Sequence, residues 1–71
     1  MATFKPKEVI SILQKLGFIK KRQTGSHLIM YHSKLKKIIP VPMHTKDIKT
    51  GTLKSIIKQA GSDEATFIEL K

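Results

Sequence analysis

Residues 25–32 read Gly-Ser-His-Leu-Ile-Met-Tyr-His, a short polar corner followed by an apolar run that contains an aromatic residue. The Gly-Ser pair is typical of a turn, and the six residues after it have the length and composition of a strand. Alternation along a strand separates two sets of side chains, His27, Ile29 and Tyr31 on one face and Leu28, Met30 and His32 on the other. Both faces are partly apolar, so the pattern leaves open which face the helices cover.

A further strand is predicted on each side of this one. Residues 18–23 have a basic centre, and cations on both faces of a strand are typical of a sheet edge. Residues 37–41 form the third strand, and Pro40 and Pro42 place it at an edge, because proline has no N–H to donate to a ladder. The expected faces of the first strand are Phe18, Lys20 and Arg22 on one side and Ile19, Lys21 and Gln23 on the other.

Helices are predicted at both ends of the strand run. Residues 6–16 begin with Pro6, which suits a first helical turn, and end before Gly17, which suits a left-handed cap. Thr50 is the expected N-cap of a second helix that ends at Gly61, and Asp63 is the expected cap of a short helix over 64–70. The apolar positions are Val9, Ile10, Leu13 and Leu16 in the first helix, Leu53, Ile56, Ile57 and Ala60 in the second, and Phe67, Ile68 and Leu70 in the third.

This order of elements predicts an α+β fold in one domain over residues 1–71. Three antiparallel strands joined by hairpins need one face covered, and two amphipathic helices at the ends of the strand run can cover it. The result is the α-β-β-β-α layout of double-stranded-RNA-binding-like domains, followed by a short C-terminal helix.

The composition points to a polyanionic partner. The formal net charge is +9, and residues 1–37 carry nine Lys or Arg against a single acid, Glu8. Nucleic acid is favoured over a membrane surface because no predicted helix combines a basic face with bulky aromatic residues, although an acidic protein is also compatible. The chain has no cysteine, no apolar run long enough to span a membrane and no secretory apolar region at its start, so we expect a cytoplasmic protein.

Four short motifs follow one another along the chain. Leu16-Gly17-Phe18 is followed by the run from Arg22 to His27, which ends in Gly-Ser-His. The next two are Val41-Pro42-Met43-His44-Thr45-Lys46-Asp47 and the run from Gly51 to Gly61, GTLKSIIKQAG. Their order and spacing resemble the HicA (YcfA-like) family of small bacterial mRNA interferase toxins, and the resemblance covers about residues 6–70. Ser62 departs from it where an apolar residue is expected, and residues 38–42 leave the register of the third strand open.

The resemblance implies a fold and an activity. It implies a double-stranded-RNA-binding-like fold, endonucleolytic cleavage of mRNA, and one catalytic histidine in the Gly-Ser-His motif, which is His27 here. It also implies a HicB-type antitoxin protein that neutralises the toxin by covering this site. No DNA binding is expected from the toxin alone.

The chemistry of RNA explains why a single histidine is informative. RNA carries its own nucleophile, the 2′-hydroxyl, so an enzyme needs to orient that group, move a proton and stabilise charge on the phosphorane. Histidine titrates nearest to neutral pH and can accept or donate that proton, so His27 is the candidate general base or general acid. The alternative interpretation is a strand histidine hydrogen-bonded to its neighbours.

Other residues are candidates for holding the RNA. Gly25 and Ser26 could form an anion-binding turn, although a plain hairpin turn explains them equally well. Tyr31 could stack a base or pack at the sheet, and His44 could be a second proton-transfer group if its loop returns towards His27. The basic residues expected to contact phosphates, or simply to protect strand edges, are Lys20, Lys21, Arg22, Lys34, Lys36 and Lys37.

No metal or cofactor is expected. The three histidines have spacings that fit no standard zinc pattern, His27 and His32 point to opposite faces, and the acids are too scattered for a two-metal site. The sequence therefore predicts a metal-independent endoribonuclease acting as the toxin of a toxin–antitoxin pair. Two alternatives are a non-catalytic RNA-binding module of the same fold and an interaction domain for an acidic protein.

Overall fold

The computed structural model describes residues 3–44 and 46–71. Met1, Ala2 and Thr45 lie outside this part, so one residue of the motif from Val41 to Asp47 is not described. The elements, in chain order, are α1 (Pro6–Lys15), β1 (Ile19–Thr24), β2 (His27–His32), β3 (Lys37–Pro42), α2 (Thr50–Gln59) and α3 (Glu64–Leu70).

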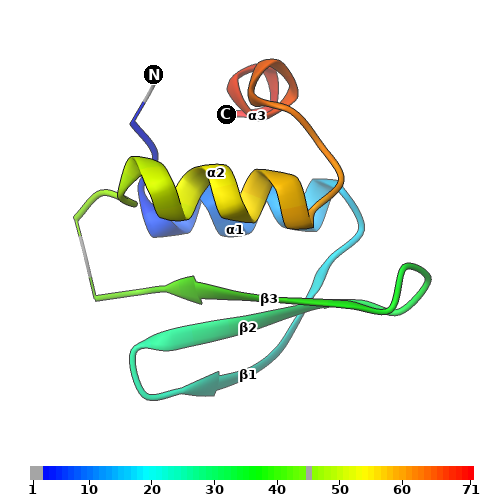
Figure 1. Ribbon diagram of the computed structural model, residues 1–71. Helices are drawn as coiled ribbons and strands as arrows, with labels where there is room; N and C mark the ends of the chain where they lie inside the picture. Colours follow the sequence, from blue (N-terminus) through cyan, green and yellow to red (C-terminus); the bar gives the residue numbers. More distant parts are fainter. Residues whose placement is uncertain (1–2, 45) are drawn as a thin grey trace.

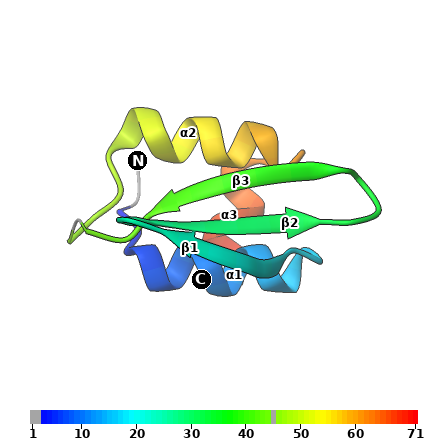
Figure 2. The same ribbon diagram turned by 90° about the horizontal axis from the view of Figure 1, so that it is seen from below.

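The elements form layers, with the sheet at one side of the molecule. Figure 1 shows α1 and α2 on one face of the sheet and α3 against the two helices, away from the strands. Figure 2 shows α2 beside β3 and α1 beneath β1, with the opposite face of the sheet uncovered. The predicted α+β layout, with helices on one face and a short C-terminal helix, is confirmed.

The strand order is β1-β2-β3, with both neighbouring pairs antiparallel, so β2 is central and the two predicted edge strands are edges. In the register of β2 and β3, His27 lies opposite Pro42 and Leu28 opposite Val41. Leu28, Met30, Ile39 and Val41 are buried, so their side of the sheet faces the helices. The side that carries His27, Ile29 and Tyr31 is the open one.

The prediction for the faces of β1 is wrong, because the strand contains a β-bulge. Lys20 lies opposite Met30 and Arg22 lies opposite Ile29, and the register shifts between them. A bulge puts two residues opposite one and so reverses the alternation beyond it. Lys20 is therefore on the helix-facing side, whereas Arg22 is on the open side.

The first two helices end in the same hydrogen-bonded motif. After α1, the N–H of Phe18 donates to the carbonyl of Leu13, and after α2 the N–H of Ser62 donates to that of Ile57. Gly17 and Gly61 precede these donors with φ of +100° and +70°, which is the Schellman arrangement. Phe18 and Leu13 are both buried, so the first motif also fixes the start of β1 against the core.

Several predicted boundaries are corrected. The first helix ends at Lys15 and not at residue 16, and the first strand spans Ile19–Thr24 and not 18–23. Thr50 is the first residue of α2 and not its N-cap, which is Lys49, and Lys49 makes no side-chain capping hydrogen bond. The third strand extends to Pro42, one residue beyond the prediction, because Pro42 pairs with His27. At α1 the first turn forms as expected, with Pro6 at its start and the Lys5 N–H donating to the Glu8 carboxylate at 2.8 Å.

The core is apolar throughout, with no buried polar or charged side chain among residues 3–44 and 46–71. Phe67 is the buried residue of α3 and packs edge-on against Phe4, with ring centroids 6.2 Å apart. Leu70 packs partly against this core, whereas Ile68 is exposed. Within these two described stretches, no helix is long and apolar enough to cross a membrane.

Gly17→Ala should destabilise the protein. A Cβ at this position would lie 2.7 Å from His32 Nε2, and φ of +100° is unfavourable for an L side chain by roughly 1–2 kcal/mol. Gly51→Ala is the matched control, because a Cβ there meets no atom within 4 Å and should stabilise α2 by up to about 1 kcal/mol. Urea unfolding measures both. Equal stability of the two variants would contradict this account.

Asp63 should make the stability of α3 depend on pH. The Thr66 N–H donates to the Asp63 carboxylate at 2.7 Å and holds the pKa of that carboxyl below its usual value of 3.8. Because the folded pKa is lowered, this stabilisation is present above the usual value and is lost as the pH falls through the folded pKa. Asp63→Ala should therefore lower the melting temperature at neutral pH, with a gap to the native chain that narrows below about pH 4. Asp63→Asn is the control, because its side chain keeps a hydrogen-bond acceptor but does not titrate. If the difference in melting temperature between Asp63→Ala and the native chain does not change with pH, the capping role of Asp63 is refuted.

Candidate active site

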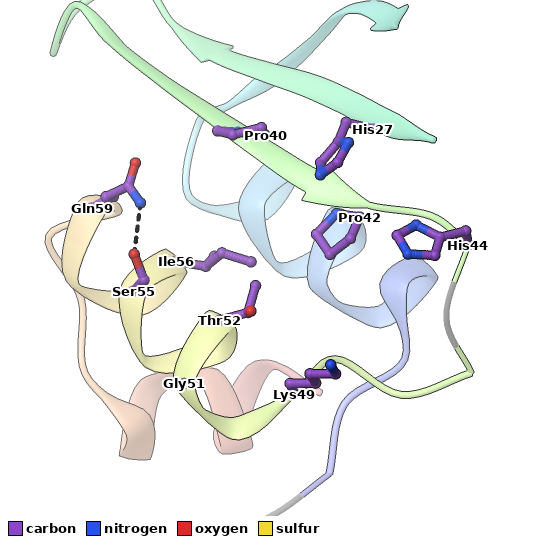
Figure 3. Close-up of a pocket in the computed structure, with 10 residues that line it drawn as sticks. All are labelled: His27, Pro40, Pro42, His44, Lys49, Gly51, Thr52, Ser55, Ile56 and Gln59. Carbon is purple, nitrogen blue, oxygen red and sulfur yellow. Dashed lines mark hydrogen bonds between the residues drawn. The ribbon is translucent and has the colours of Figure 1, made fainter. Parts of the chain in front are cut away.

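A groove of about 550 Å³ runs along the outer edge of β3, between that strand and α2. Figure 3 shows His27 and the two prolines of β3 on one side, the polar face of α2 on the other, and His44 at one end. Proline has no N–H, so Pro40 and Pro42 offer no donors for an added strand. The lining residues are His27, Pro40, Pro42, His44, Lys49, Gly51, Thr52, Ser55, Ile56 and Gln59.

His27 is placed at this groove by the hairpin between β1 and β2. Thr24 pairs with His27, so Gly25 and Ser26 alone form the turn. Gly25 has φ of +55°, the left-handed value that a two-residue hairpin requires at its first central position. The histidine that follows is exposed and lies opposite Pro42 on β3. Its imidazole is accessible and not sealed in the core.

His44 reaches the same place from the loop after β3. The Met43 N–H donates to the Ser26 carbonyl at 2.6 Å, which ties this loop to the β1–β2 turn. The ring centroids of His27 and His44 are 6.2 Å apart, with an angle of 60° between the ring planes. Both rings line the groove, and His44 is exposed as well.

The opposite wall of the groove was missed by the sequence analysis. Thr52, Ser55 and Gln59 are exposed polar residues of α2, and the Gln59 side-chain amide donates to the Ser55 hydroxyl at 3.0 Å. Their spacing places them on one face of a helix, which the sequence could have revealed. Nothing in that spacing indicates that the face looks towards His27.

The three adjacent cations of β1 point in different directions. Lys20 lines a different groove, of about 410 Å³, together with Lys7 of α1. Lys21 lies over the ring of Tyr31, 5.0 Å from its centroid, and Arg22 is on the open face opposite Ile29. Tyr31 is therefore half-buried under a lysine on the open face of the sheet.

Lys34, Lys36 and Lys37 are at the far end of β2 from His27. The strand spans six residues, so its far end is about 17 Å from His27 at roughly 3.3 Å per residue. Lys37 is half-buried and its ammonium lies towards Gly61, where a Cβ would be 3.7 Å from Nζ. The structure does not bring these three lysines to the groove.

His32 makes contacts within the protein that are typical of a structural residue. Its Nδ1 accepts a hydrogen bond from the Leu35 N–H at 3.1 Å, and its ring packs edge-on against Phe18 with centroids 5.1 Å apart. It lies on the helix-facing side of β2, away from His27. Among residues 3–44 and 46–71, no group of three His, Cys, Asp or Glu lies close enough to hold a metal ion.

These features define a small basic α+β domain of the double-stranded-RNA-binding-like layout, with two exposed histidines in one groove. The family model described as the HicA toxin of bacterial toxin-antitoxin matches residues 6–62, from the start of α1 to the residue after Gly61. The chain belongs to this HicA toxin family and is the toxin of a toxin–antitoxin system, whose antitoxin is its partner. The match spans all the groove residues and leaves α3 outside. No curated protein gives a significant match.

Proposed function

We propose that this toxin is an endoribonuclease that cleaves mRNA in the cytoplasm, with His27 as a proton-transfer residue. The observation that carries the proposal is the position of His27, which is exposed at a groove and opposite a rigid proline. The family supplies the biological role, and the net charge of +9 suits a polyanionic substrate.

The proposed reaction uses the nucleophile of the substrate. The ribose 2′-oxygen attacks the adjacent phosphorus and the bond from phosphorus to the 5′-oxygen breaks, leaving a 2′,3′-cyclic phosphate and a 5′-hydroxyl. The 2′-hydroxyl loses a proton and the leaving oxygen gains one. His27 performs one of these transfers, as general base or general acid, and a metal ion is not required for either.

The other residues proposed to contact RNA differ in how close they lie to His27. Gly25 and Ser26 adjoin His27, and an anion would be held by their N–H groups, whereas the hydrogen bond from Met43 uses the Ser26 carbonyl. Arg22 is two residue pairs along the hairpin from His27 on the same face. Lys37 lines a neighbouring pocket together with Gln59, which also lines the groove. The groove lining includes none of the other proposed phosphate contacts, which are Lys20, Lys21, Lys34 and Lys36.

The partner follows from the same site. We propose that a HicB-type antitoxin neutralises the toxin by covering the groove and His27. A cover at this position would exclude RNA without altering the fold.

His27→Ala should reduce RNA cleavage by about 10²–10⁴-fold while leaving RNA binding nearly unchanged, because a proton-transfer role contributes about that much. Cleavage of a labelled RNA in the presence of chelator, with binding measured separately, checks this. His32→Gln is the control for loss of a histidine from the same strand, since His32 faces the helices. Undiminished cleavage by His27→Ala, or products with a 5′-phosphate, would refute the mechanism. If the native chain binds RNA but does not cleave it, the alternative interpretation as a non-catalytic RNA-binding module is supported instead.

RNA binding should weaken steeply as salt concentration rises. If about four cations meet phosphates, log K should fall with log salt at a slope near −3, since each contact to a single strand contributes roughly −0.7. Arg22→Gln should make the slope shallower by about 0.7. Lys58→Gln is the matched control, because Lys58 lines a different surface of α2. Binding that does not respond to salt, or no binding, would contradict the RNA substrate and favour an acidic protein partner.

A further inference from the structure

The proposed cleavage needs two proton transfers, but His27 accounts for only one. The 2′-hydroxyl must lose a proton on one side of the phosphorus and the leaving 5′-oxygen must gain one on the other. The titratable side chains that line the groove are His27, His44 and Lys49. A lysine ordinarily titrates near pH 10.4 and a histidine near 6.5, so near neutral pH histidine is the better proton carrier.

We propose that His44 is the second proton-transfer residue, and that the two histidines act as an acid–base pair across one phosphate. This inference rests on the proposed ribonuclease function and adds a catalytic residue to it. The ring centroids are 6.2 Å apart, and both exposed rings line the same groove. For the pair to act on one phosphate, each ring must lie within about 2.6–3.2 Å of a different oxygen.

The loop that carries His44 is held at both ends. On the side nearer the sheet, Pro42 pairs with His27, and the Met43 N–H donates to the Ser26 carbonyl at 2.6 Å. On the other side, the Ile48 N–H donates to the Phe4 carbonyl at 2.8 Å, and Ile48 is buried. The pairing of the two rings is therefore a consequence of the hairpin turn and the edge strand.

Lys49 adds a basic side chain to the groove that holds the two histidines. It is the residue before α2, and its basic side chain lines the same groove. A cation there suits the charge that develops on the phosphorane oxygens, while the two imidazoles exchange protons with the attacking and leaving oxygens. His32 is excluded from this arrangement, since it packs against Phe18 on the other face of β2.

A substrate with a sulfur leaving group separates the two roles. In an RNA whose 5′-bridging oxygen at one linkage is replaced by sulfur, the leaving thiolate needs no proton, so loss of the general acid is tolerated. The experiment compares this substrate with ordinary RNA for the full chain and for His27→Ala and His44→Ala. His44→Gln is included as a second variant, and RNA binding and thermal unfolding confirm that each variant folds.

On ordinary RNA, His44→Ala should slow cleavage by about 10²–10⁴-fold with RNA binding retained, and one limb of the bell-shaped pH profile should disappear. On the sulfur substrate, cleavage should recover in one of the two alanine variants and stay slow in the other. The variant that recovers identifies the general acid.

Several outcomes overturn the pair, and they differ from failure of the proposed function. Undiminished cleavage of ordinary RNA by His44→Ala and His44→Gln removes His44 while leaving His27 in place. Recovery of both alanine variants, or of neither, rejects a division of roles between the two histidines. Undiminished cleavage by His27→Ala refutes the proposed function itself, and the pair with it.

Discussion

The register of β2 against β3 is the constraint on which both the core and the groove depend. With His27 opposite Pro42, Leu28 and Met30 face the helices and are buried, and the histidine is left accessible at the edge. A slip by one residue would turn every side chain of β2 to the other face, which would bury the imidazole and expose the core residues. The same pairing that builds the sheet therefore positions the candidate catalytic group.

The ends of the helices set the position of the sheet against α1 and α2. Gly17 ends α1 in a left-handed conformation, and Phe18 then enters the core beside His32. On the other side, α2 packs along β3 and brings its polar residues up to the edge of the sheet. An edge strand with two prolines borders this groove, so no ladder donors compete with a ligand at those positions.

The basic residues proposed as phosphate contacts lie on several different surfaces of the protein. The bulge in β1 puts Lys20 and Arg22 on opposite faces, and the length of β2 separates His27 from the lysines of the second hairpin. A bulge depends on how two strands meet, so the side-chain period of the sequence did not reveal that Lys20 and Arg22 lie on opposite faces. Conversely, Lys49 is distant from His27 in sequence and lines the same groove.

The sequence by itself determined the order of elements, the edge positions of β1 and β3, the apolar faces of the helices, the cap of α3 by Asp63 and the exposed turn before His27. Each of these follows from local physical chemistry: side-chain period, proline without an N–H, glycine with positive φ and a carboxylate beside free N–H groups. Only the tertiary structure decided which face of β2 the helices cover, because both faces are partly apolar. It also decided that His44 meets His27, because that approach depends on a hydrogen bond between Met43 and Ser26 and on the path of a loop, neither of which is set by spacing along the chain.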